Sequence, residues 1–511
     1  MTSNTMVMRV AIRVDASAAI GTGHIKRCLS LAQALSESGA EIRFVCRHID
    51  TVAARLMNMG VHAEHWLPAP AEALTPQPDA PPHAAWAGVP QAQDATETTL
   101  ALSKWCPDWV VVDHYAFDAR WHRAVRDALG CRLLVVDDTA DRALDADALL
   151  DHNWAPDHRA KYAGRLTREP RWFCGPRFAL LSAAYRHAPR YCFHDPVRSA
   201  GVFMGGTDPG GISGRALAAC RSAGFSGLVE VVSTSANPQL PALREACARD
   251  GRAALTLDHP NLATFFARHD LQIGAGGGAA WERCCIGAPS VVVAFADNQN
   301  AVVKALGSLG AAVGSSPDAL HLSNSVRALI EKPELRRNMA ALSRELVDGY
   351  GTLRVAIALL GSKVLLTPAK QSDAKIAFPW RNSAITRRFF RDPRTLTLIE
   401  HMAWWCQTLS RADRNLLIAR LGRVKVGVLR LDWDAERQQA EVSIYLDPNY
   451  AGLGLGKQML RELSLWVQVS ASNPKRLVAE IHPDNLASRR AFESAGYRRL
   501  DDQHWCLELA I

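Results

Sequence analysis

The first residue along the chain whose type and position suit catalysis is a histidine that follows a glycine turn. His24 ends the string I-G-T-G-H, which contains Gly21 and Gly23 and stands between an apolar run over 8–14 and a helical pattern over 28–35. Backbone amides freed at a helix start favour an anionic ligand, and the helix dipole opposes protonation of a histidine there. The pattern therefore predicts a base that works near neutral pH beside an anion. A tight turn with a surface histidine is the other interpretation.

A second glycine run enters a predicted helix in the middle of the chain. The run covers 274–278, and Glu282 follows one turn into the helix. The amides of Gly277 and Gly278 can hold a diphosphate, and the carboxylate of Glu282 can accept hydrogen bonds from ribose hydroxyls. Close packing of the helix on its strand would also explain the glycines.

A third glycine-rich turn lies near the other end of the chain. Leu453, Gly454, Gly456 and Lys457 follow a strand pattern over 441–446 and lead into a helical pattern. Amides at such a helix start suit a pyrophosphate. The sequence therefore predicts a second anion site in a separate part of the chain.

The glycine turns before His24 and before Glu282 must be positioned by parallel strands. Short apolar runs alternate with helix-length segments from residue 8 to about 153, and again over about 197–362. This alternation predicts two doubly wound α/β domains, and two such halves facing each other would form a cleft.

Composition divides the chain further. We predict Rossmann-type domains over 1–155 and 156–365, a linker over 366–378 and an α+β domain over 379–511. The proline-rich stretch 67–90 cannot sustain a helix or a central strand, and it is predicted to be an exposed insertion loop.

Length and charge set broad limits. At roughly 100 to 200 residues per domain, 511 residues predict about three domains, and the net charge of +8 fits a phosphate-bearing ligand better than duplex nucleic acid. The 12 cysteines form no C-x-x-C pair, so neither a zinc knuckle nor a disulfide framework is indicated. No signal peptide or membrane span is apparent, and we expect a cytoplasmic protein with no nucleic-acid partner and no stable membrane association.

The first two domains carry a series of motifs. They are D-A-S-x-x-I-G-T-G-H-I-K-R-C from Asp15, V-V-D-H-Y over 111–115, V-D-D over 136–138, M-G-G-T-D over 204–208, and the later W-E-R-C-C-x-G-x-P and D-N-Q segments. Taken in this order, the motifs resemble those of the UDP-sugar hydrolases of pseudaminic acid biosynthesis, which are GT-B-like enzymes. The resemblance covers about 8–365.

This resemblance implies hydrolysis of UDP-2,4-diacetamido-2,4,6-trideoxy-beta-L-altropyranose to UDP and the free sugar, without a metal or cofactor. His24 would be the general base, with Asp15 beside it in catalysis. Asp113 and Tyr115 would line the sugar site, although a carboxylate at a strand end also caps a neighbouring helix. The implied substrate-binding residues are Gly21, Gly23, Asp113, Tyr115, Gly205, Gly206, Gly277, Gly278, Glu282, Asn298 and Gln299. Ala279 and Ala280 stand where family members often carry hydroxyl residues, so phosphate binding would rest on backbone amides.

The last domain resembles GNAT acetyltransferases, through the glycine turn above and the later string H-P-D-N-L-A-S-R-R-A-F-E-S-A-G-Y over 482–497. Trp380, Arg381 and Asn382 with E-H-x-x-W from Glu400 are similar to the branch that acetylates UDP-4-amino-4,6-dideoxy-N-acetyl-beta-L-altrosamine. Acetyl-CoA is the implied cosubstrate, held by Leu446, Leu453, Gly454, Gly456, Lys457 and Asn485.

Two departures from the GNAT pattern affect chemistry. Ala451 replaces the Arg or Gln that opens the glycine turn, and Phe492 replaces the tyrosine that often acts as general acid. Tyr445 and Tyr497 are possible substitutes for that tyrosine. Glu441, Glu480 or His482 could deprotonate the amine, and each could also be a solvated strand residue.

Two other functions remain open on the sequence. The first two domains could form a UDP-sugar glycosyltransferase or epimerase, and the third could bind CoA or a partner without catalysis.

Overall fold

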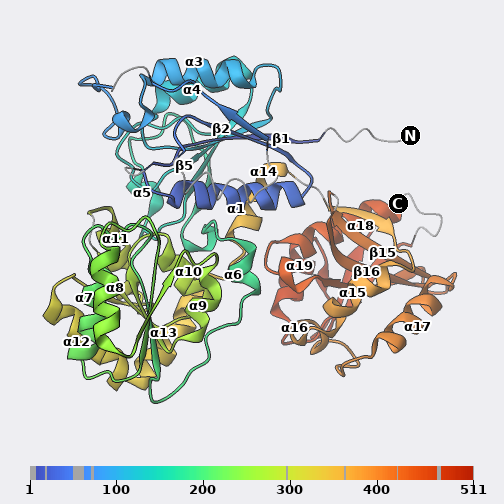
Figure 1. Cartoon of the computed structure of the whole chain (residues 1–511). Helices are drawn as coiled ribbons and strands as arrows, with labels where there is room; N and C mark the ends of the chain where they lie inside the picture. The colour runs from blue at the N-terminus through green and yellow to red at the C-terminus, as the bar shows by residue number, and fades with distance from the viewer. Residues whose placement is uncertain are drawn as a thin grey trace. The chain divides into compact units, whose positions relative to one another are not determined.

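The computed structural model describes residues 7–17, 20–49, 63–70, 74–294, 297–361, 364–422, 424–468 and 474–509. The chain forms two compact units: the first ends at Ala356, and the second comprises the chain from Ile357 onward together with Glu37–Gly39. The first unit contains two α/β sheets, and the second contains one mixed sheet (Figure 1). The predicted α/β class, with two doubly wound parallel-sheet domains followed by an α+β domain, is confirmed.

The first sheet is fully parallel, with the strand order β3-β2-β1-β4-β5-β6-β7. Its strands are β1 (Arg9–Val14), β2 (Glu41–Cys46), β3 (Ala63–Trp66), β4 (Trp109–Asp113), β5 (Arg132–Val136), β6 (Ala148–Asp151) and β7 (Arg171–Cys174). Helices α3 (Gln91–Leu102) and α4 (Ala119–Leu129) cover one face, while α1 (Gly23–Glu37) covers the other (Figure 1). The central strands are buried on both faces, which explains their continuous apolar runs.

The order of this sheet reverses at β1, which pairs with β2 on one side and β4 on the other. Connections that leave β1 and β4 turn to opposite faces, and they open a crevice at the carboxyl ends of these strands. The loop from β1 into α1 carries His24, and Asp113 ends β4. Two residues that lie 89 positions apart in the sequence therefore meet at the switch point.

The second sheet is also parallel, with the order β10-β9-β8-β11-β12-β13. Its strands are β8 (Ser199–Phe203), β9 (Leu228–Ser233), β10 (Ala253–Leu257), β11 (Leu271–Ala275), β12 (Ser290–Val293) and β13 (Val313–Ser315). One face packs against α7 (Ile212–Ser222), α8 (Leu240–Asp250) and α12 (Ala319–Glu331), and the other against α6 (Ala183–His187), α9 (Leu262–Arg268), α10 (Ala279–Ile286), α11 (Asp297–Ser308) and α13 (Pro333–Leu346). The switch point lies between β8 and β11, which lead into the two glycine loops of this domain.

The sheet of the second unit has the order β14-β15-β16-β17-β18-β20-β19, and it is antiparallel except between β17 and β18. Its strands are β14 (Val364–Pro368), β15 (Arg414–Leu421), β16 (Val424–Asp434), β17 (Gln439–Leu446), β18 (Arg476–Glu480), β19 (Arg498–Arg499) and β20 (His504–Glu508). Helices α18 (Leu455–Gln468) and α19 (Leu486–Ser494) pack on one face, and α15 (Asp373–Asn382) and α17 (Leu398–Leu409) on the other. Two further helices lie in this part of the chain: α14 (Gly351–Leu360) follows α13, and α16 (Ala384–Arg387) follows α15.

The prediction of a linker over 366–378 is wrong. Strand β14 pairs with β15 from Val364 to Pro368, and α15 begins at Asp373. Asp373 is buried and accepts a hydrogen bond from Lys425 on β16, at 2.5 Å. The polar composition that indicated a linker reflects an edge strand and the first turn of a helix.

The proline-rich stretch is only partly the exposed loop that was predicted. Ala84–Ala87 forms a 3-10 turn in which Ala84 and Ala87 are buried. His48, which follows β2, donates a hydrogen bond from Nε2 to the carbonyl of Ala87 at 3.2 Å. Gly88 has a φ of +72° and fits so closely against His48 that a side chain there would clash. The described part of this segment is therefore attached to the sheet.

Candidate functional site

His24 and Asp113 form a buried pair at the switch point of the first sheet. The distance from His24 Nδ1 to Asp113 Oδ1 is 2.6 Å, and the Asp113 side chain is fully buried. Arg27, one turn further along α1, donates to both carboxylate oxygens at 2.5 Å. Burial opposes ionisation of Asp113, but Arg27 and His24 outweigh it and hold the pKa of this carboxyl well below its usual range.

This arrangement fixes the tautomer of the histidine. An ionised carboxylate can only accept a hydrogen bond, so Nδ1 of His24 carries the proton and donates it to Asp113. The lone pair is then on Nε2, which is the nitrogen that can accept a proton. The geometry therefore suits general-base chemistry, with Asp113 as the residue that orients the ring.

Asp15 lies below this pair in a buried layer of charges. It pairs with Arg13 through both oxygens at 2.8 and 2.9 Å, and it accepts from His114 Nε2 at 3.1 Å. The backbone N–H groups of Arg47 and His48 also donate to it, at 2.6 and 3.1 Å. Because Asp15 is fully buried and its oxygens are occupied, its position argues for a supporting role and against direct catalysis.

Trp86 and His83, which the sequence analysis did not single out, belong to a cluster of rings that includes His24 and Tyr115. The ring of Tyr115 lies 4.8 Å from that of His24, and Trp86 stacks on Tyr115 with 5.9 Å between ring centroids. His83 lies 4.5 Å from Trp86 and 5.7 Å from Tyr115. Both Trp86 and His83 are half-buried and come from the segment that the sequence marked as an exposed loop. The sequence could have indicated this cluster only through the presence of a histidine and a tryptophan among small residues.

A chain of hydrogen bonds runs from Tyr115 to the second sheet. Tyr115 donates to Asp138 at 2.5 Å, and Asn153 Nδ2 donates to the same carboxylate at 2.9 Å. The indole N–H of Trp281, at the start of α10, donates to Asn153 Oδ1 at 2.9 Å. The two halves of the first unit are thus connected through the residues next to the His24 site.

His152 is a further residue that the sequence did not single out. It follows β6, it is 8% exposed, and its Nδ1 has no hydrogen-bond partner among the described residues. Burial and then the nearby charge of Arg27 lower the pKa of His152 to about 4, so the ring is neutral at pH 7. A neutral imidazole with an unused nitrogen can form a hydrogen bond with a substrate.

The glycine run of the second sheet has two different parts. A side chain at Gly274 would clash with Arg283, and one at Gly276 would clash with Val303. At Gly277 and Gly278, by contrast, an added side chain would meet no atom within 4 Å. The first part serves packing, as the alternative interpretation proposed, while the second leaves open space beside the start of α10.

Gly205 and Gly206 follow β8 at the same edge of the sheet as this open space. Gly205 has a φ of +98° with nothing within 4 Å of an added side chain, and Gly206 is in ordinary contact with Thr234. Gly21 and Gly23 in the first domain are equally open, and Gly21 has a φ of +78°. Gly21, Gly23 and Gly205 thus leave open space beside the backbone, whereas Gly206 packs against Thr234.

Glu282 is half-buried on α10, and its carboxylate lies near the hydroxyl of Tyr185. Burial and the adjoining carboxylate raise the pKa of Tyr185 well above its usual value. Gln299 lies beside the glycine run, since its Cβ is 3.3 Å from the position of a side chain at Gly276. The side chain of Asn298 lies outside the described residues.

In the second unit, the glycine turn is shaped by backbone conformation. Gly452 and Gly454 have φ values of +78° and +76°, with open space around both. Leu453 packs on the core, and Lys457 is half-buried in the first turn of α18. The amides at the start of α18 and the side chain of Lys457 suit a pyrophosphate, although Ala451 has no polar side chain to contribute.

Strands β17 and β18 separate beside this turn. They pair only from Gln439 to Glu441 on β17, although β17 continues to Leu446. The backbone beyond the pairing is open to an extended ligand such as the pantetheine arm of CoA. Asn485 instead caps α19, where its side chain accepts from the N–H of Ser488 at 3.1 Å.

The two tyrosines proposed as general acids lie in different surroundings. Tyr445 packs against Phe390 on the face of the sheet opposite α18, and burial raises its pKa. Tyr497 is 3% exposed and packs against Phe492, and its hydroxyl has no partner among the described residues. Burial also raises the pKa of Tyr497, which disfavours the anion that remains after proton donation. The surroundings of Tyr445 and Tyr497 therefore do not identify either tyrosine as the general acid.

The candidate bases Glu441 and Glu480 share one arginine. Arg391 contacts Glu441 at 3.1 Å and also pairs with Glu480. The two carboxylates stand where β17 and β18 begin to separate, beside the predicted site of acetyl transfer. Arg391 would need to move for either to accept a proton from an amine.

Comparison with known proteins gives a domain match in the second unit and two distant relatives of longer segments. Residues 363–498 match the acetyltransferase (GNAT) domain family. The chain is 20% identical over 538 aligned positions to an uncharacterised protein of Methanocaldococcus jannaschii, covering 99% of this chain and 100% of that protein. It is 22% identical to the UDP-2,4-diacetamido-2,4,6-trideoxy-beta-L-altropyranose hydrolase of Campylobacter jejuni, covering 59% of this chain and 97% of the hydrolase.

Among solved structures, the MurG protein of Acinetobacter baumannii aligns with 70% of this chain and 99% of its own. The identity is 13% and the TM-score is 0.47. Within the described residues, no helix is long and apolar enough to cross a bilayer, and no group of three or more His, Cys, Asp or Glu side chains is arranged to hold a metal ion.

The buried position of Asp15 leads to a stability prediction. Asp15→Ala leaves Arg13 with one of its two carboxylate partners and should lower the free energy of unfolding of the first unit by about 3 kcal/mol. Urea unfolding followed by tryptophan fluorescence measures this loss.

Glu245→Ala is the matched control, because it removes an exposed ion pair with Arg249 and should cost under about 0.5 kcal/mol. An unfolding curve of Asp15→Ala that overlies the wild-type curve would return Asp15 to the list of catalytic candidates.

Proposed function

We propose that the first unit hydrolyses a UDP-sugar at its anomeric carbon, with UDP-2,4-diacetamido-2,4,6-trideoxy-beta-L-altropyranose as the substrate. The observation that carries this proposal is the buried His24–Asp113 pair at the switch point of the first sheet, next to the turn that contains Gly21 and Gly23. The similarity to the Campylobacter jejuni hydrolase supports the choice of substrate.

In the proposed reaction, Nε2 of His24 accepts a proton from water while the water oxygen attacks the anomeric carbon. The bond between that carbon and the diphosphate oxygen breaks, and UDP departs with the electron pair. Asp113 stabilises the imidazolium that forms, and Arg27 keeps Asp113 ionised. A diphosphate is a good leaving group, so the main requirement is to position water and stabilise charge.

The remaining residues of the site have roles that follow from their surroundings. Amides of Gly277 and Gly278 face open space at the start of α10 and would hold the diphosphate. Glu282 would accept from the ribose. Trp86 and Tyr115 present an apolar wall next to His24, and such a wall suits the C–H faces and acetamido methyl groups of a deoxysugar.

For the second unit, we propose acetyl transfer from acetyl-CoA to the amine of the preceding UDP-4-amino sugar. The turn from Leu453 to Lys457 would bind the pyrophosphate of the cosubstrate, and the separated strands would bind its pantetheine arm. The amine must lose a proton as its nitrogen attacks the acetyl carbonyl, and the thiolate of CoA leaves. Glu441 and Glu480 are the carboxylates placed to accept that proton.

The role of His24 can be tested by removing its basic nitrogen. His24→Asn should lower the rate of UDP release by about 10²- to 10⁴-fold, because a general base contributes on that scale. The dissociation constant for UDP should stay nearly unchanged, since the diphosphate is held by backbone amides. UDP release is followed by a coupled assay and UDP affinity by calorimetry.

His65→Asn, at an exposed position on β3, is the matched control and should leave both quantities unchanged. Turnover of His24→Asn at the wild-type rate would remove His24 as the base.

The aromatic wall gives a second test in the same domain. Trp86→Ala should raise KM for the UDP-sugar about tenfold while changing kcat less, because the wall contacts sugar in the ground state and the transition state alike. Steady-state kinetics separate the two constants.

Trp66→Ala is the control, because this tryptophan is half-exposed on β3. Equal KM values for Trp86→Ala and the wild type would show that the sugar does not contact this wall.

The acetyl-CoA turn can be blocked at one glycine. Gly454→Val places a branched side chain at a φ of +76° and should weaken acetyl-CoA binding by at least about tenfold, with UDP-sugar hydrolysis unchanged. Ala451→Val in the same turn has an ordinary extended conformation and should bind normally. A matching loss of hydrolysis in Gly454→Val would contradict independent activities.

A further inference from the structure

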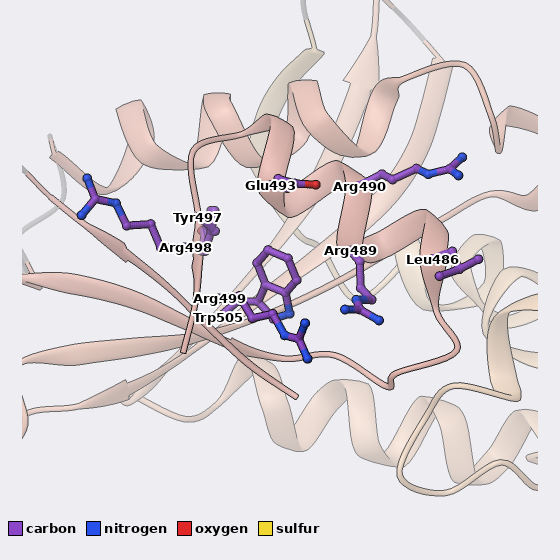
Figure 2. A pocket seen from close by; sticks show the side chains of 8 residues that line it. All are labelled: Leu486, Arg489, Arg490, Glu493, Tyr497, Arg498, Arg499 and Trp505. Carbon is purple, nitrogen blue, oxygen red and sulfur yellow. The ribbon is translucent and has the colours of Figure 1, made fainter. Parts of the chain in front are cut away.

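The outer side of α19 carries a cavity that neither proposed reaction uses. It has a volume of about 530 Å³ and is lined by residues of α19, β19 and β20 with the turn before β19 (Figure 2). This volume falls in the range typical of small-molecule sites, roughly 300 to 1,000 Å³.

This cavity faces away from the acetyl-CoA turn. Ala491 on α19 faces α18, because its Cβ is 3.5 Å from the position of a side chain at Gly456. At about 100° per residue, the lining positions Leu486, Arg489 and Glu493 lie roughly 140 to 160° around the helix from Ala491. The cavity and the start of α18 are therefore on opposite sides of α19.

The lining is strongly basic. Four of its residues are arginines, Arg489, Arg490, Arg498 and Arg499, against one carboxylate, Glu493. Arg489 uses one N–H group on the carbonyl of Pro483, at 3.1 Å. Arg499 donates to the carbonyl of Asp501 at 2.8 Å and pairs with Asp502, so part of its hydrogen-bonding capacity is already used. Figure 2 shows the side chains of Arg489 and Arg499 pointing toward the space beside the Trp505 ring.

Two buried donors in the lining lack an acceptor. The indole N–H of Trp505 and the hydroxyl of Tyr497 have no hydrogen-bond partner among the described residues, although the two residues are only 5% and 3% exposed. A buried donor without a partner is unfavourable, and a bound oxygen acceptor would relieve it. The orphan donors and the arginine excess call for the same kind of ligand, one that is rich in anionic oxygen.

We propose that this cavity is a binding site for a small molecule carrying a diphosphate group, separate from the acetyl-CoA site. Arginine guanidinium groups recognise phosphate oxygens through paired hydrogen bonds, and the Trp505 N–H supplies one further donor. The site would let the acetyltransferase unit respond to a nucleoside diphosphate or to free pyrophosphate. The proposal does not depend on hydrolysis by the first unit.

Hydrogen exchange of the full chain, measured by mass spectrometry in the wild type and in Gly454→Val, tests this site, because that variant blocks the acetyl-CoA turn. Titration with inorganic pyrophosphate should slow exchange in peptides covering residues 486–507 equally in both proteins. Arg489→Ala should weaken the pyrophosphate affinity read from these peptides by about tenfold. UDP and uridine are compared in parallel: protection by UDP but not uridine shows that the diphosphate is the recognised group.

Two further variants complete the design. Trp505→Phe keeps an aromatic ring in the core and removes only the donor, and it should weaken binding several-fold. Arg437→Ala, in the exposed turn after β16, is the matched control and should bind as the wild type does. The proposal is overturned by no protection of 486–507 at saturating pyrophosphate, by equal affinity in Arg489→Ala and the control, or by loss of protection in Gly454→Val.

Discussion

The ionised carboxylate of Asp113, held away from water, is the interaction on which the first site depends. Arg27 compensates for its burial, and the carboxylate in turn fixes which nitrogen of His24 carries a proton. Without Arg27, burial would favour the neutral acid, and a protonated Asp113 would not hold the ring in the form that leaves Nε2 as a base. All three groups are brought together by a strand order that reverses at β1.

A second buried network supports the first from below. Arg13, Asp15 and Asp94 join β1 to α3, and Arg47 joins the residues after β2 to the same cluster. Breaking one member of such a cluster leaves an uncompensated buried charge. Buried ion pairs therefore join the elements beneath the site, while glycines, Trp86 and His83 form the side that we propose faces the ligand. This division between a buried ion-paired layer and a ligand-facing side suits an enzyme that must place one water molecule accurately.

The sequence predicted those features that depend on local pattern. Apolar runs followed by glycine turns predicted the parallel strands, the start of α1 with His24 and the start of α18, because strand, turn and helix signals lie within about 15 residues of one another. Trp86 and His152 were missed because their positions beside His24 depend on contacts across many residues. The resemblance led to Asp15 being predicted as catalytic. Its burial could not be foreseen, because its partners Arg47 and His114 are distant in sequence. The segment 366–378 was misread because edge strands and first helical turns share the polar composition of linkers.

The central claim is that one chain acetylates a UDP-amino sugar and then releases the sugar from UDP. Its most direct test is a mass-spectrometric assay of the purified protein with the UDP-4-amino sugar, with and without acetyl-CoA. The account predicts free diacetamido sugar and UDP only when acetyl-CoA is present. If the amino sugar and its acetylated form, supplied directly, both remain intact, the proposed hydrolysis is contradicted and a glycosyltransferase becomes the better account of the His24 site.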